Sequence, residues 1–278
     1  MILDLLWSKK CFWRTIGVVW KRVENEVEVM KRFMVVVIIF CIGSLMAQLP
    51  SSDDILDKME AISNIDNSKV LMRQIIQTST GKERAMEFES YSGNNGEKSL
   101  MRYTKPASVK GQAFLMLNNA DDIWSYYTRT GRVRKLATHA KKQSVQGSDF
   151  TFDDMGGNDT WKEEFDSRTV KEEKFAGMKC WQLELVAKPE TDQSYQKLLI
   201  WTDQKTYYPV KIEYFDEASD HLKTLIMSDI QLIEDIPTAM KIVMTNHQKF
   251  TETRMEILEI TYQWAPPKGF FSERSLKK

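Results

Sequence analysis

The sequence predicts one mostly β domain with helices, an α+β fold whose strands pair as antiparallel neighbours. A two-residue hydrophobic period runs through "WQLELVA" (181–187), "YPVKIEYF" (208–215) and "AMKIVMT" (239–245), as in strands with one buried face. Turn-forming residues separate such runs in "SGNNGE" (92–97), "RTGR" (129–132) and "FAGMK" (175–179), which favours hairpins. The length of 278 residues suits one large core better than two.

The first 48 residues do not read as part of that domain. The stretch "MKRFMVVVIIFCIGSLMAQ" (30–48) has a basic start, an apolar run and a small-residue end, which is the layout of a secretory signal. Its 15 residues from Phe33 to Ala47 are fewer than the ~20 that a spanning helix needs. We expect 30–47 to be a signal peptide cleaved after Ala47, 1–29 a spurious upstream extension, and 48–278 a single domain.

One helix is expected at the start of this domain, over 51–63. Ser51 or Ser52 can cap it, and two aspartates follow in the first turn, where carboxylates stabilise a helix. The apolar side chains that recur at helical spacing are Ile55, Leu56, Met59 and Ile62.

Several expected strands are apolar on both faces. Examples are "AFLMLNN" (113–119) and "EILEITYQW" (256–264), whereas a sheet with one face in water alternates more cleanly. Either other parts of the chain cover the second face, or an apolar ligand does.

Composition and motifs exclude several functions. Lys+Arg and Asp+Glu both total 39, so no basic surface indicates nucleic acid. The three histidines (His139, His221 and His247) lack partners at zinc-motif spacing, and no nucleophile, phosphate-loop or dinucleotide motif occurs. We therefore expect no catalytic residue, no metal and no cofactor.

After signal cleavage Cys180 is the only cysteine, and its apolar neighbours predict a buried, inert thiol.

The stretch "QSVQGSDFTFDDMGG" (143–157) reads as a short apolar helix between glycines. Thr151 can cap a helix whose first turn holds Asp153 and Asp154. The apolar side comprises Phe150, Phe152 and Met155, and the glycines at the two ends are Gly147 and the pair Gly156–Gly157. This pattern predicts a mobile lid over 147–157.

Three blocks in order resemble the outer-membrane lipoprotein-sorting protein family, relatives of the periplasmic lipoprotein carrier LolA. They are "RYTKPASVKGQAFLML", "DDIWSYYTRTGRVRKLATHAKKQSVQGSDFTFDDM" and "WAPPKGFFSERSL", and the resemblance covers residues 50–278. It implies a curved, incompletely closed antiparallel β-barrel with a helical lid over a hydrophobic concave face that holds acyl chains. It also implies the periplasm and a carrier role toward the outer membrane.

The matching positions are Pro106, Lys110, Gly111, Trp124, Tyr126, Arg132, Gly147, Ser148, Asp149, Phe150 and Asp154. Most of them we expect to be structural. The residues expected to contact lipid are Trp124, Tyr126, Phe150, Phe152 and Met155. The expected partners are acyl chains of lipoproteins or another envelope lipid, with an inner-membrane transporter as a further candidate.

Two alternatives to a carrier are left open. The first is a lipid-binding sensor or an accessory subunit of an inner-membrane lipid exporter, because related half-barrels serve such roles. The second is an envelope hydrolase, for which the paired carboxylates Asp121–Asp122 and Glu163–Glu164 are the candidates. Adjacent residues on a strand point to opposite faces and cannot converge on one bond, which disfavours this function.

Overall fold

The computed structural model describes residues 30–31, 49–156, 161–191 and 193–278. The predicted upstream extension and, apart from residues 30 and 31, the predicted signal peptide lie outside these residues. By internal contacts the chain divides into Met1–Gln48 and Leu49–Lys278. The second unit contains every strand of the described residues.

The strands of the described residues form one 13-stranded antiparallel sheet in the order β6-β5-β4-β3-β2-β1-β13-β12-β11-β10-β9-β8-β7. Strand β1, near the start of the domain, pairs with the last strand, β13. The strands are β1 (Asn67–Gln77), β2 (Glu83–Gly93), β3 (Lys98–Lys105), β4 (Ala113–Leu117), β5 (Asp122–Tyr127), β6 (Arg132–Lys135), β7 (Phe165–Phe175), β8 (Met178–Ala187), β9 (Lys197–Asp203), β10 (Pro209–Phe215), β11 (His221–Ile233), β12 (Ile236–Asn246) and β13 (Thr251–Tyr262).

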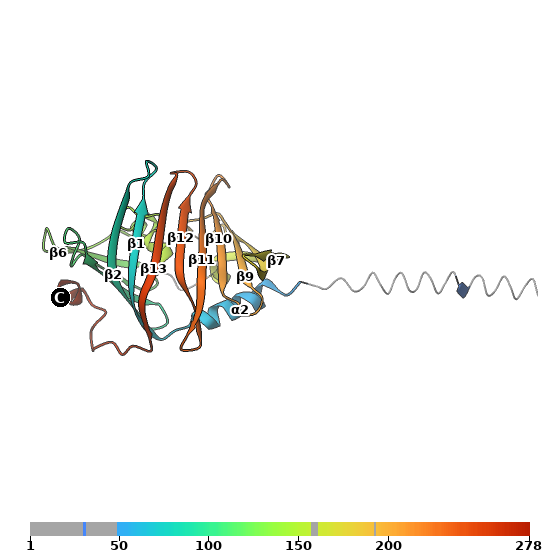
Figure 1. The fold of residues 1–278 in the computed structure, drawn as a ribbon, viewed down its shortest axis with the longest axis horizontal. Coiled ribbons are helices and arrows are strands. Elements are labelled where there is room, and N and C mark those ends of the chain that lie inside the picture. The colour runs from blue at the N-terminus through green and yellow to red at the C-terminus, as the bar shows by residue number, and fades with distance from the viewer. Residues whose placement is uncertain (1–29, 32–48, 157–160, 192) are drawn as a thin grey trace, which may run out of the picture. The chain divides into compact units, whose positions relative to one another are not determined.

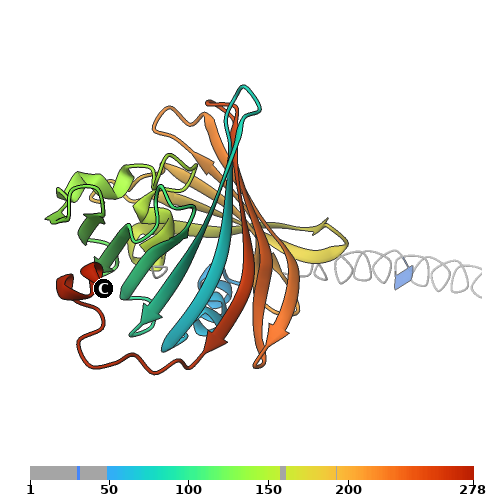
Figure 2. The same cartoon turned by 60° about the vertical axis from the view of Figure 1, so that its left-hand side comes forward.

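This sheet is strongly curved and remains open. Figures 1 and 2 show long, twisted strands that bend around one side of the sheet. Strands β6 and β7 stand at the two ends of the strand order and do not pair with each other. The predicted mostly β fold and its incomplete closure are therefore confirmed.

The predicted turns connect neighbouring strands. Asn94, Asn95 and Gly96 all have positive φ between β2 and β3, and Gly177 has a φ of 85° between β7 and β8. Residues without β-branching adopt this left-handed conformation most easily, and glycine does so without steric cost.

Helix α2 (Ser52–Ser63) confirms the helix expected over 51–63. Its apolar side buries Ile55, Leu56 and Met59, as the helical spacing indicated. The expected side-chain cap does not form, because Ser51 makes no capping hydrogen bond. Instead, the hydroxyl of Ser167 on β7 donates to Ser52 Oγ over 2.9 Å, which joins the start of the helix to the sheet.

The connection between β6 and β7 and the C-terminal segment carry the remaining short helices. These are η1 (Thr138–Lys142), α3 (Phe152–Gly156), α4 (Trp161–Glu164) and η2 (Glu273–Lys277). Figure 2 shows the β6–β7 connection in yellow-green, beside the strands β4 to β6. None of the helices in the described ranges has the length and apolar character that crossing a bilayer requires.

Strand β4 is buried on both faces because the chain itself covers each of them. Phe114 and Met116 belong to the core on the inner face, whereas Ala113 and Leu115 pack in a separate cluster with Leu276 of the C-terminal segment. The second apolar face of β4 is therefore covered by the chain itself, which was one of the two interpretations of its sequence; the other was an apolar ligand. On β13, Leu258 lies at the bulge between the pairs Met72–Ile257 and Leu71–Glu259 and is exposed.

Cys180 on β8 is a free, fully buried thiol. It packs with Trp201 and Val210, and burial raises the pKa of this thiol above its usual value. Because the thiolate is the reactive form, the expected inert behaviour follows from this position.

Candidate functional site

The inner face of the sheet carries a continuous apolar core, here called the inner cluster. It contains residues of strands from both halves of the strand order, of helix α2 and of the β6–β7 connection. Its buried members include Ile55, Leu56, Met59, Met86, Phe88, Met101, Phe114, Val145, Phe150, Phe152, Phe165, Leu183, Leu185, Ile200, Met244 and Met255. Several are flexible methionines, which adapt to irregular apolar partners.

Residues 143–156, here called the cover segment, cross this inner face. Phe150 and Phe152 are only 5% and 4% exposed, and Met155 packs against the inner cluster. The Phe152 ring meets the Phe114 ring of β4 edge-on, with centroids 5.2 Å apart. These three side chains therefore touch the lining of the concave face, as the sequence indicated.

The predicted cap of the short helix is present. The backbone N–H of Asp154 donates to Thr151 Oγ1 over 3.1 Å, and the backbone N–H of Thr151 donates to Asp154 Oδ2 over 2.7 Å. This reciprocal arrangement is a capping box with Asp in the third helical position. It holds α3 in place with Phe152 facing the core.

A buried ion pair joins the cover segment to the sheet. Lys223 Nζ on β11 lies 2.9 Å from Asp154 Oδ2, with the two side chains 5% and 4% exposed. The same ammonium donates to the Tyr195 hydroxyl (2.6 Å) and to the carbonyl of Asp149 (3.0 Å). Tyr195 in turn donates to Asp154 Oδ1 over 2.7 Å. We call Lys223, Asp154 and Tyr195 the latch.

Asp149 anchors the other half of the cover segment. Its backbone N–H donates to Thr253 Oγ1 over 2.9 Å, and its carboxylate accepts hydrogen bonds from the hydroxyls of Thr251 and Thr253 on β13. Charge-assisted hydrogen bonds to a buried carboxylate are among the stronger ones. Two separate buried carboxylates thus fasten this short stretch to β11 and β13.

These anchors hold the expected lid against the sheet, and its mobility stays a prediction. Gly147 does have the positive φ of a hinge, 74°, and Gly157 lies outside the described residues. Between them, however, opening would expose Phe150 and Phe152 and separate Lys223 from Asp154, which is costly for a buried pair. The segment is a latched cover.

The sequence carried one signal for the latch that our predictions did not use. Along β11, Lys223 lies on the same face of the strand as Leu225 and Met227, which both belong to or contact the inner cluster. A lysine in the apolar phase of a strand requires a buried partner. No local sequence pattern identifies that partner as Asp154, which lies 69 residues earlier in the chain.

Trp124 and Tyr126 do not join the other expected lipid-contacting residues. Both pack in the outer cluster, which contains Leu115 and Leu276 and is covered by Trp264 and the phenylalanines of the C-terminal segment. On β5 the inner face carries Ile123 instead. The five expected contact residues therefore lie on opposite faces of the sheet and do not form one site.

Three of the residues matched to the family, Pro106, Lys110 and Gly111, lie in the turn between β3 and β4. The carbonyl of Pro106 accepts from the N–H of Lys110 over 3.0 Å, and the N–H of Gly111 donates to the Tyr103 carbonyl over 2.8 Å. Gly111 has a φ of 81°, and a Cβ there would lie 2.9 Å from Thr128 Cγ2. This turn leads directly into β4.

Two more matched residues, Arg132 and Ser148, lie outside this turn. Arg132 is exposed at the start of β6. Ser148 is buried in the cover segment beside Gly147, and its hydroxyl lies 3.3 Å from the Phe150 carbonyl.

A cavity of about 360 Å³ opens beside α3 and α4, and carboxylates line much of it. Glu163 and Glu164 belong to α4, so the strand argument against their convergence does not apply to them; both line this cavity. Burial, with Asp154 and Glu164 nearby, raises the pKa of Asp153. Asp121 also lines the cavity, whereas Asp122 pairs with Lys135.

No group of three or more metal-ligating side chains occurs among the described residues. His221 and His247 lie together, with ring centroids 4.2 Å apart, and Thr224 Oγ1 is within 3.0 Å of both Nε2 atoms. Burial and the neighbouring His221 lower the pKa of His247. The side chain of His139 lies outside the described part of the chain.

Solved structures share this fold. An outer membrane lipoprotein-sorting protein domain from Vibrio parahaemolyticus is 26% identical, with a TM-score of 0.73 over 81% of this chain and 97% of its own. A DUF1329 protein from Desulfovibrio piger is 23% identical, with a TM-score of 0.72 over 80% and 96%. A LolA superfamily protein from Nitrosomonas europaea is 20% identical, with a TM-score of 0.68 over 82% and 100%.

The fold is therefore that of the LolA-like proteins, and the resemblance seen in the sequence is confirmed. A family model described as "Uncharacterized protein" matches residues 95–278, and the chain belongs to that family. A search of curated proteins finds no match.

Proposed function

We propose that this protein is a periplasmic carrier that shields the acyl chains of lipoproteins or another envelope lipid on its concave face. The observation that carries the proposal is the inner cluster beneath a cover that two buried carboxylates, Asp154 and Asp149, fasten to the sheet. Similarity to an outer membrane lipoprotein-sorting protein domain supports the same role.

The energetics suit a non-covalent carrier. Each CH₂ group moved from water to an apolar surface contributes ~0.8 kcal/mol, so one acyl chain offsets the cost of displacing two buried phenylalanines at ~1.5–3 kcal/mol each. An acyl chain on the inner cluster would replace the contacts that Phe150 and Phe152 make in the closed form. The cover and the lipid would then compete for one surface.

Export is part of the proposal. The signal layout over 30–47 directs the chain across the inner membrane, residues 1–29 are not part of the functional protein, and the domain begins near Gln48. Cleavage leaves a protein without any covalent lipid at Cys41, because that cysteine is removed with the signal peptide.

Native mass spectrometry of the protein recovered from the periplasm of a bacterium with two membranes tests both parts at once. The polypeptide mass should correspond to a chain that starts near residue 48, and gentle ionisation should preserve adducts with the mass of envelope lipids. A polypeptide that retains residues 1–29 would refute the export part. A cleaved polypeptide without lipid adducts, before and after incubation with lipid vesicles, would refute the carrier part.

A sensor or an accessory subunit of a lipid exporter would use the same lipid site and differs only in its protein partner. A neighbouring transporter gene would favour the accessory role, and a neighbouring anti-sigma-factor gene would favour sensing.

For a hydrolase, the carboxylates around the 360 Å³ cavity are the residues to test, by turnover of ester or glycoside substrates. No further observation on the described residues favours these alternatives over the carrier.

A further inference from the structure

We propose that a small cavity between the cover segment and the rim of the sheet binds the phosphodiester group of an amphiphile. The cavity has a volume of about 160 Å³, room for roughly five water-sized groups at ~30 Å³ each. That space suits a phosphorus atom with its four oxygens. It does not suit an acyl chain.

Three lysines from separate parts of the chain line this cavity: Lys142 at the end of η1, Lys223 on β11 and Lys249 in the turn between β12 and β13. The Lys223 ammonium already donates to the latch and to the Asp149 carbonyl, so it contributes its charge to the cavity. The remaining lining consists mainly of hydrogen-bonding side chains, including the hydroxyl of Ser144. Lysine ammonium groups bind phosphate as point charges, and hydroxyls donate to its remaining oxygens.

The charge balance favours a monoanion. Two carboxylates accompany the three ammonium groups: Asp154 pairs with Lys223, and Asp149 lines the cavity while its oxygens accept from two threonines. Counted alone, these five groups carry a net positive charge. A phosphodiester carries one negative charge, which matches that surplus.

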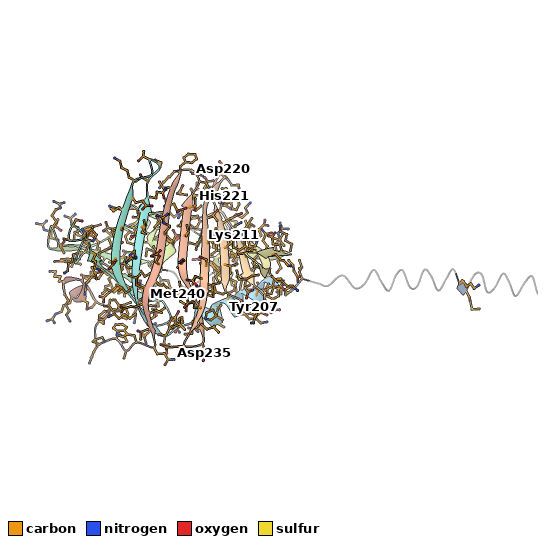
Figure 3. The ribbon with its side chains drawn as sticks, in the orientation of Figure 1. Tyr207, Lys211, Asp220, His221, Asp235 and Met240 are labelled. Atoms are coloured by element: carbon orange, nitrogen blue, oxygen red, sulfur yellow. The ribbon has the colours of Figure 1, made fainter. Side chains whose placement is uncertain are left out.

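Two larger cavities share Tyr195 with this one. The cavity of about 360 Å³ presents Asp153, Glu163 and Glu164, which repel a phosphate. The small cavity lies near the end of β11 that His221 marks in Figure 3, because Leu222 and Lys223 follow it directly and both line the cavity. A headgroup there would sit at the rim of the covered inner face.

This inference rests on the proposed function in one respect only: the proposed function supplies the site for the acyl chain of the amphiphile. Its direct test is the double variant Lys142→Gln and Lys249→Gln, because both side chains are exposed and neither belongs to the latch. Lys241→Gln, an exposed lysine on β12 away from the cavity, is the matched control. Lysophosphatidylglycerol and an alkyl maltoside of equal chain length are titrated into each purified protein by calorimetry, with glycerophosphoglycerol and inorganic phosphate as probes without chains.

The double variant should bind lysophosphatidylglycerol at least about tenfold more weakly, since it loses two charge-assisted contacts, and should bind the maltoside unchanged. Lys241→Gln should leave both affinities unchanged. Equal affinity of wild type and double variant for lysophosphatidylglycerol, or equal weakening for both amphiphiles, would overturn the proposal.

If neither amphiphile binds the wild type, the carrier function fails but the cavity is still tested. Glycerophosphoglycerol or phosphate binding that the double variant loses would then support a site for soluble phosphates. Absence of binding by every probe would overturn the site as well. Competition by inorganic phosphate against lysophosphatidylglycerol separates a general phosphate site from one that requires the lipid headgroup.

Discussion

Replacing Phe150 and Phe152 together by Asp is expected to remove most of the folding stability of the domain. Truncation of a buried Phe costs ~3–5 kcal/mol, and two carboxylates would also have to enter an apolar core. Both rings are almost fully buried in the inner cluster. The loss is comparable with the ~5–15 kcal/mol that stabilises a typical domain. Urea unfolding followed by tryptophan fluorescence measures it.

Phe250→Asp is the matched control for this variant. Phe250 is 78% exposed and has a φ of 56°, a conformation that Asp adopts more readily than a bulky residue. Its replacement should change the free energy of unfolding by at most about 0.5 kcal/mol. If the double variant were as stable as this control, residues 147–156 would be a solvated loop.

Phe152→Leu separates packing from lipid binding, because it keeps the side chain apolar and removes the ring contact with Phe114. We expect slightly lower stability and altered retention of a fluorescent fatty acid. Lower stability with unchanged retention would make Phe152 a core residue only.

Replacing Lys223 by Met is expected to cost about 3–5 kcal/mol, because it leaves the Asp154 carboxylate buried without its cation. Fatty-acid exchange should become faster, since the cover segment loses its bond to β11. Combining Lys223→Met with Asp154→Asn should restore much of the stability, as no buried charge then remains unpaired. Stopped-flow exchange of a fluorescent fatty acid and urea unfolding measure the two effects.

Lys69→Met provides the comparison for the ion pair. Lys69 lies 3.3 Å from Glu89, and its side chain is 41% exposed, so its loss should cost at most about 1 kcal/mol. Destabilisation by Lys223→Met without faster exchange would show that the latch supports the core and does not control access to the inner face.

Local patterns predicted much of the fold. The two-residue period located strands such as β8, β10 and β12, and helical spacing located α2. The glycine and asparagine turns located the hairpins β2–β3, β5–β6 and β7–β8. No local sequence pattern predicts the pairing of β1 with β13, because this pairing joins segments from the two ends of the domain. The family resemblance supplied the open, curved sheet.

The candidate site was predictable only in part, for a reason visible on β5. Period two groups Trp124 with Tyr126, but it does not say which face of the sheet they occupy. Because the C-terminal segment covers the outer face there, both faces are apolar and the usual distinction between buried and exposed faces is lost. Phe150, Phe152 and Met155 lie beside a helix cap, so their orientation followed from the sequence.

The central claim, that acyl chains occupy the inner cluster, is tested most directly by cross-linking with a photoactivatable fatty acid followed by peptide mass spectrometry. The account predicts labels on inner-face residues such as Met155 and Met244, and labelling should be suppressed by excess unmodified fatty acid. Labels confined to the outer cluster around Trp124, Tyr126 and Trp264, or labelling that excess fatty acid does not suppress, would contradict it.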